Sequence, residues 1–86
     1  MNEVASVVKE FILNEFLRGE DPNQLTESTP LITSGVIDSL ATLRLVAFLE
    51  ERFGVQFEAY EMDASNLNTL ADIRRTVTSK LEGAQP

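Results

Sequence analysis

One serine is better placed for chemistry than any other residue, in the run Gly35-Val36-Ile37-Asp38-Ser39-Leu40. A serine nucleophile needs an adjacent base, and the 86-residue chain contains neither His nor Cys. Lys9 and Lys80 fall on other predicted helices, which disfavours a Ser–Lys pair. We therefore expect no catalytic residues, and Ser39 is better suited to be a point of attachment than a nucleophile.

An ordinary structural role is also open for this dipeptide, since either Asp38 or Ser39 can cap the helix that follows. The start of a helix would also stabilise a serine that carries a negatively charged modification. The first turn of a helix presents amide N–H groups and the positive end of the helix dipole, which favour a phosphate. That environment would tolerate a phosphodiester but would not activate a hydroxyl.

Clustered carboxylates occur at Glu50-Glu51 and at Glu58, Glu61 and Asp63. We interpret them as a solvated helix face and a solvated loop. A weak divalent-ion site over 58–63 is the alternative, but its spacing matches no ion-binding loop, so no metal site is expected.

The length of 86 residues predicts one small domain, and a hydrophobic content of 43% is ordinary for a globular one. Acidic residues outnumber basic ones by 14 to 7, for a net charge of −7, which argues against nucleic acid as a partner. No apolar run approaches the length of a membrane span and the N-terminus lacks a signal-peptide pattern, so we expect a cytoplasmic protein with no membrane partner.

Hydrophobic spacing predicts an amphipathic helix over 3–17, a second helix from about 39 to 53 ended by Gly54, and a last helix opened by Thr69. A short helical turn is expected within 61–66. The long stretch 18–37 is predicted as a loop pinned to the core by Leu25, Leu31, Ile32, Val36 and Ile37. The expected fold is all-α: a small four-helix bundle of three main helices and one short one. Residues 1–82 would form a single domain and residues 83–86 a disordered tail.

The helix after Ser39 carries two apolar stripes. One stripe has the width of a core face and comprises Thr42, Leu45, Val46, Leu49 and Phe53. The other consists of Leu40, Leu43 and Ala47, flanked by Arg44, Glu50 and Glu51. This second stripe can pack under the long loop or form an exposed docking surface with a polar rim, and the two interpretations are not exclusive.

Taken together, these residues resemble the acyl carrier and peptidyl carrier protein family. The similarity begins at 35–40, includes Leu45 and Leu49, and continues through Glu51-Arg52-Phe53-Gly54-Val55, Glu61-Met62-Asp63 and 66–73. The first helix and the long loop also fit, so the resemblance extends over nearly the whole chain.

The resemblance implies that Ser39 receives 4′-phosphopantetheine from coenzyme A, transferred by a separate Mg²⁺-dependent phosphopantetheinyl transferase. Asp38 would help that enzyme and its metal engage. The arm would carry an acyl or aminoacyl group as a thioester. The partner-binding residues would be Leu40, Leu43, Arg44, Ala47, Glu50 and Glu51. A monomer is expected, and the chain itself would not be an enzyme.

Carriers of fatty acid synthesis usually have an acidic stretch along the helix that follows the modified serine, and this sequence differs from them at two positions of that helix. Ala41 and Arg44 make the surface more apolar and of mixed charge. The sequence therefore looks more like a stand-alone carrier of a secondary-metabolite pathway. Its partners would be an adenylating or acyl-loading enzyme and a downstream acyl-transfer, condensing or tailoring enzyme. The alternative is an unmodified helical adaptor that uses Leu40, Leu43 and Ala47, with Ser39 serving only as a cap.

Overall fold

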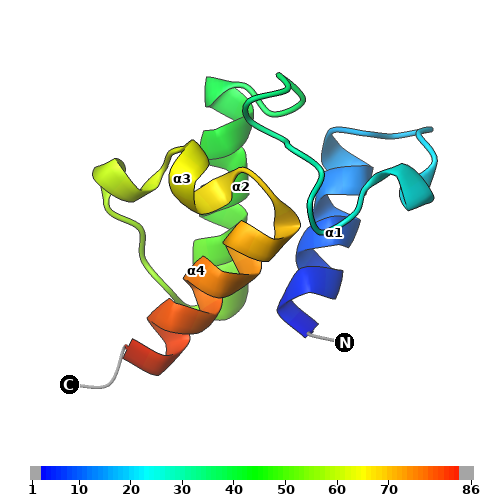
Figure 1. Cartoon of the computed structure of the whole chain (residues 1–86). Helices are drawn as coiled ribbons and strands as arrows, with labels where there is room; N and C mark the ends of the chain where they lie inside the picture. Colours follow the sequence, from blue (N-terminus) through cyan, green and yellow to red (C-terminus); the bar gives the residue numbers. More distant parts are fainter. Residues whose placement is uncertain (1–2, 84–86) are drawn as a thin grey trace.

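Helices and connecting turns make up the part of the chain that the computed structural model describes, residues 3–83 (Figure 1). The α-helices are α1 (Glu3–Glu15), α2 (Ser39–Phe53), α3 (Ala64–Leu67) and α4 (Leu70–Gly83). Two 3₁₀ turns, Pro22–Gln24 and Ala59–Glu61, lie in the loops before α2 and α3. The predicted all-α bundle of three main helices and one short helix is confirmed.

The core forms where the apolar faces of the helices meet, and α4 contacts each of the other three helices. Thr42, Leu45, Val46 and Leu49 of α2 are all buried, and Phe53 is partly buried against the core. The predicted core face of α2 is thus confirmed. Because side chains on α2 pack inward along one stripe, the orientation of the whole helix about its axis is fixed.

Helix α2 ends where the sequence predicts. Gly54 adopts a left-handed conformation with φ of 70°, and its backbone N–H donates to the carbonyl of Glu50. Glycine reaches this conformation without the steric cost that a Cβ would impose. The chain then turns into the segment that leads to α3.

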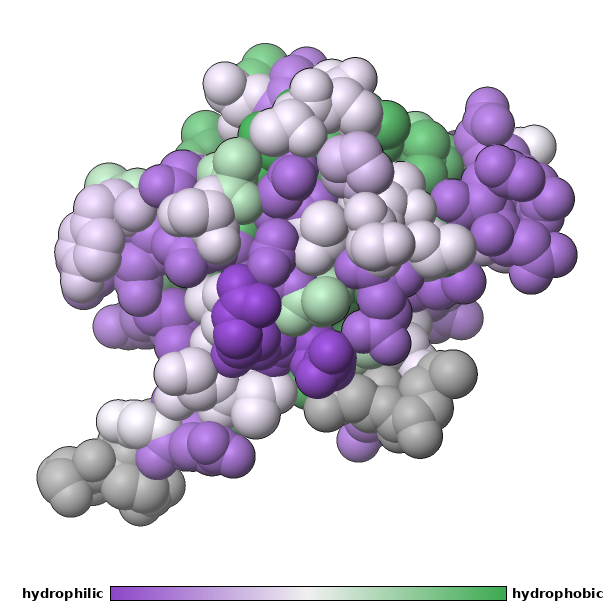
Figure 2. Space-filling view, viewed as in Figure 1, coloured by the Kyte–Doolittle hydropathy of each residue, from purple (hydrophilic) through white to green (hydrophobic). Residues whose placement is uncertain are grey.

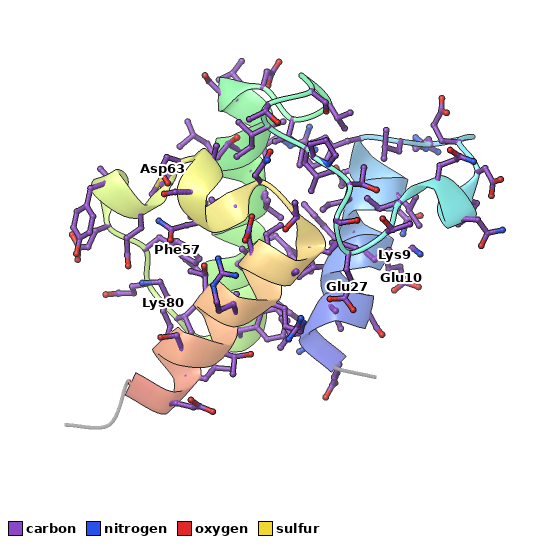
Figure 3. All side chains as sticks on the ribbon, viewed as in Figure 1. Lys9, Glu10, Glu27, Phe57, Asp63 and Lys80 are labelled. Carbon is purple, nitrogen blue, oxygen red and sulfur yellow. The ribbon has the colours of Figure 1, made fainter. Side chains whose placement is uncertain are left out.

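The loop between α1 and α2 is held against α4 at its middle. The carbonyl of Glu27 accepts a hydrogen bond from the backbone N–H of Ala71 at 3.1 Å. The Glu27 carboxylate also pairs with the Arg74 guanidinium at 3.0 Å (Figure 3). The loop is therefore an ordered part of the fold and can position the beginning of α2.

Three expectations about local structure need correction. Helix α1 ends at Glu15 rather than at residue 17, because the Leu17 N–H donates to the carbonyl of Ile12, five residues earlier, instead of to the carbonyl of Leu13 as an α-helix requires. Val36 does not pin the loop: its neighbour Ile37 bonds back to the loop and is buried, which leaves Val36 37% exposed. Gly83 belongs to α4 rather than to a tail, and the remainder of the expected tail, residues 84–86, lies outside the described residues.

Candidate functional site

Asp38 caps α2. Its backbone is extended, and its carboxylate Oδ1 accepts a hydrogen bond from the Ala41 N–H at 2.8 Å. Its carbonyl accepts two more hydrogen bonds, from the backbone N–H and the hydroxyl of Thr42, each at 2.8 Å. The choice that the sequence left open between Asp38 and Ser39 is thereby decided in favour of Asp38.

Ser39 is the first residue of α2 and is exposed. Since Asp38 supplies the cap, the serine hydroxyl is not needed to satisfy the helix end. Within residues 3–83 no hydrogen bond involves that hydroxyl. The serine is therefore accessible at the tip of a helix whose position is fixed by its buried face.

A groove of about 480 Å³ opens beside Ser39. One wall is the end of the long loop and the first turns of α2, and the other is Met62 and Asp63, just before α3. Its lining combines apolar and polar side chains: Ile32, Gly35, Ile37, Asp38, Ser39, Thr42, Leu43, Met62 and Asp63. A flexible group attached to Ser39 could lie along this groove.

The wall at Met62 and Asp63 is tied to α4 through Glu61. The Lys80 ammonium donates to Glu61 Oε1 at 2.7 Å and lies 4.7 Å from the centre of the Phe57 ring (Figure 3). The backbone N–H of Glu58 donates to the same oxygen at 2.7 Å. Together the Glu58 N–H and the Lys80 ammonium lower the pKa of the Glu61 carboxyl below its ordinary value of 4.5, against the opposing effect of partial burial.

The second stripe of α2 faces solvent. Leu40 is 73% exposed, Leu43 is 54% exposed and Ala47 is also exposed. The alternative in which this stripe packs under the long loop is therefore wrong. In Figure 2 most of the hydrophobic surface lies in separate patches along the upper part of the molecule, the end at which α2 begins, among hydrophilic side chains. We call Leu40, Leu43 and Ala47 the outer face of α2.

The charged residues beside the outer face of α2 differ in their surroundings. Arg44 forms an ion pair with Glu15 of α1, and its guanidinium lies 5.7 Å from the centre of the Phe16 ring. Glu50 accepts a hydrogen bond from the backbone N–H of Phe57 at 2.9 Å and is half-buried. Glu51 is exposed. Arg44 and Glu50 thus contribute to the fold through contacts with residues outside α2. The positions of the two residues around the helix axis do not reveal these contacts.

Two of the carboxylates within 58–63 accept hydrogen bonds from nearby groups: Glu61 from Lys80 and the Glu58 N–H, and Asp63 from residues of α3. Asp63 accepts hydrogen bonds from the hydroxyl of Ser65 and the side-chain amide of Asn66. No group of three or more metal-binding side chains comes together among the described residues. None of the helices in residues 3–83 is long and apolar enough to span a membrane.

A comparison with protein-family models matches residues 12–73 to the phosphopantetheine attachment site family. The match includes the capped start of α2, the groove and most of the core. The chain belongs to this family. The resemblance drawn from the sequence is confirmed, and the chain is a carrier protein of the kind that bears 4′-phosphopantetheine. A search of the curated proteins found no match.

Sequence reasoning did not find the contacts that hold the groove of this carrier. Lys80 and Glu61 are 19 residues apart. Asn68 accepts hydrogen bonds from Ile32 and Thr33 of the loop, which precede it by 36 and 35 positions. No local pattern signals such pairs, because they depend on how α4 and the loops pack. Asp38 and Ser39, by contrast, stand in a local motif, and for this reason the sequence alone can single them out as candidates.

We predict that replacing Asp38 and Ser39 has unequal effects on stability. Asp38→Ala should lower the free energy of unfolding by about 1 kcal/mol, because the N-cap is lost. Ser39→Ala should change it by less than about 0.5 kcal/mol, since the hydroxyl bonds to nothing in residues 3–83. Urea denaturation measures both, with Asp38→Asn as the control that keeps a capping oxygen. Equal losses for the two alanine variants would contradict the assignment of the cap.

A second prediction concerns Glu61. Because its pKa is lowered by folding, the stability it contributes is fully present above pH 4.5 and is lost as pH falls through the folded-state pKa. In Lys80→Met the hydrogen bond from the Glu58 N–H remains, but the hydrogen bond and the positive charge of Lys80 are lost, so the pKa of Glu61 should rise. Carboxyl NMR titration measures this, with Lys9→Met as a control. An unchanged pKa of Glu61 in Lys80→Met would contradict the predicted contact.

Proposed function

We propose that this carrier protein holds 4′-phosphopantetheine on Ser39 and presents a covalently bound biosynthetic intermediate to partner enzymes. The observation that carries the proposal is the serine itself. Its hydroxyl is exposed and unbonded within residues 3–83, at the first turn of a helix whose cap is supplied by Asp38. A separate transferase would bring the group from coenzyme A.

The residues around Ser39 fit that group. The first-turn N–H groups and helix dipole of α2 favour the negative phosphodiester, by roughly 0.3–1 kcal/mol for an exposed charge. The groove beside the serine offers polar Asp38 and Thr42 together with apolar Ile37, Leu43 and Met62, which suits an arm of alternating polar and apolar units. When bound, the arm supplies the thiol that this cysteine-free chain lacks, and with it a thioester to the cargo.

Asp38 has two roles in the proposal. One carboxylate oxygen caps α2 and thereby fixes where Ser39 stands. The carboxylate is exposed, which leaves it accessible to the Mg²⁺-dependent transferase. With no His or Cys in the sequence and no base bonded to Ser39 within residues 3–83, the chain itself would catalyse no step.

The outer face of α2 is the proposed docking surface for partners. An exposed apolar patch with a polar rim is the usual form of such a surface, and this one adjoins Ser39. Glu15 offsets the charge of Arg44, so apolar contact rather than net charge would dominate docking. This supports a role in secondary-metabolite synthesis, with an adenylating or acyl-loading enzyme and a downstream acyl-transfer, condensing or tailoring enzyme as partners. We propose that the chain forms a single carrier unit that includes all of α4, to Gly83.

The attachment is tested with purified protein, coenzyme A, Mg²⁺ and a broad-specificity phosphopantetheinyl transferase. Intact-protein mass spectrometry should detect one added phosphopantetheine, and none in Ser39→Ala. Ser65→Ala is the matched control, because it removes another exposed hydroxyl and should be modified normally. If folded wild-type protein gains no mass while a control carrier is modified by the same transferase, the unmodified adaptor would be favoured instead.

A further prediction tests the docking surface. Leu43→Asp should lower kcat/KM for loading of the modified protein by its adenylating or acyl-loading enzyme, because it places a charge on the apolar face. Leu81→Asp is the control, since Leu81 is also exposed (41%) but lies at the far end of α4. Circular dichroism should find both variants folded. Equal loading of the two variants would contradict the assignment of this face.

A further inference from the structure

Asn68 lies between α3 and α4 and joins them to the end of the long loop. Its side-chain Oδ1 accepts hydrogen bonds from the backbone N–H groups of Ile32, at 2.9 Å, and Thr33, at 3.0 Å. The Thr33 hydroxyl approaches the same oxygen at 3.4 Å. Two backbone donors converge on one atom, so that atom must be the amide oxygen.

The backbone of Asn68 extends the same connection. Its carbonyl accepts a hydrogen bond from the N–H of Leu31 at 2.7 Å. Asn68 therefore fixes three consecutive loop residues, 31–33, by accepting a hydrogen bond from each backbone N–H. The side chain of Leu31 is fully buried, so this point of the loop is held both by polar contacts and by the core.

Leu31 in turn fixes the residue that precedes the cap of α2. Its carbonyl accepts a hydrogen bond from the N–H of Ile37 at 3.0 Å, and the Ile37 side chain is buried. The chain between them reverses at Gly35, which has φ of +86°. A continuous series of bonded groups therefore runs from Asn68 through Leu31 and Ile37 to Asp38 and Ser39.

We infer that Asn68 is a positioning residue for attachment at Ser39, because its contacts with residues 31–33 set the place of the chain that leads into α2. The inference rests on the proposed function of Ser39. Asn68 does not touch the serine, and it acts through the loop. Proper placement of a reacting group matters strongly, since a displacement of about 1 Å can slow a reaction on the order of 100-fold.

The test compares variants of Asn68 for the rate of transfer and for order in the loop. In Asn68→Ala, kcat/KM for phosphopantetheine transfer should fall about 10- to 100-fold. Amide hydrogen exchange in the unmodified protein should quicken at Ile32, Thr33 and Ile37, while Leu45 and Leu49 stay protected. Asn68→Asp keeps an accepting oxygen in place and should restore both the rate and the protection.

Two further variants separate positioning from general stability. Asn68→Gln keeps the amide but displaces its oxygen by one methylene group, and should give an intermediate rate even if Asn68→Ala folds poorly. Thr76→Val removes the hydrogen bond of 3.0 Å between Thr76 and the Asn66 carbonyl, which joins α3 and α4 without touching the loop. It should leave the transfer rate unchanged.

The outcomes distinguish this inference from the function on which it rests. Wild-type protein that accepts no phosphopantetheine would overturn the proposed function, and the inference with it. If the wild-type protein is modified, and the folded Asn68→Ala variant receives phosphopantetheine at the same rate, the inference alone would be overturned. An equal slowing in Thr76→Val would also overturn it, since loss of stability would then account for the effect.

Discussion

The hydrogen bond from the Ala41 N–H to the Asp38 carboxylate is the contact on which the site depends. It makes Asp38 the cap and Ser39 the first residue of α2. The serine hydroxyl is consequently left exposed and without a structural task in the described chain. A chain that instead used Ser39 as the cap would hold that hydroxyl against its own backbone and compromise its reactivity.

The rest of the fold holds that helix start in place. The inner face of α2 packs into the core, so the outer face of α2 must point to solvent. Asn68 and Glu27 fasten the long loop to the α3–α4 end and to α4, and Lys80 fastens the segment before α3. Both walls of the groove beside Ser39 are therefore set by contacts that originate at or near α4.

The sequence predicted those features that depend on local periodicity and on end signals. The core face of α2, the glycine at its end and the four-helix composition follow from spacing and capping chemistry within a few residues. Exposure of Leu40 and Leu43 could not be predicted, because it depended on the path of the loop. The same limit applies to Arg44, whose ion-pair partner Glu15 lies 29 positions earlier in the chain. Burial of Ile37 without Val36 could not be predicted either, because the reversal of the chain at Gly35 decides which of the two adjacent apolar residues turns inward.

Tandem mass spectrometry of peptides from the transferase-treated protein tests the central claim most directly, because it locates the added group on a single residue. The account predicts that fragment ions place all of the added phosphopantetheine mass on Ser39. Location of the group on another hydroxyl, such as that of Ser34 or Thr33, would contradict it. The account expects neither to be modified, because the Ser34 hydroxyl bonds to the loop and the Thr33 hydroxyl to Asn68.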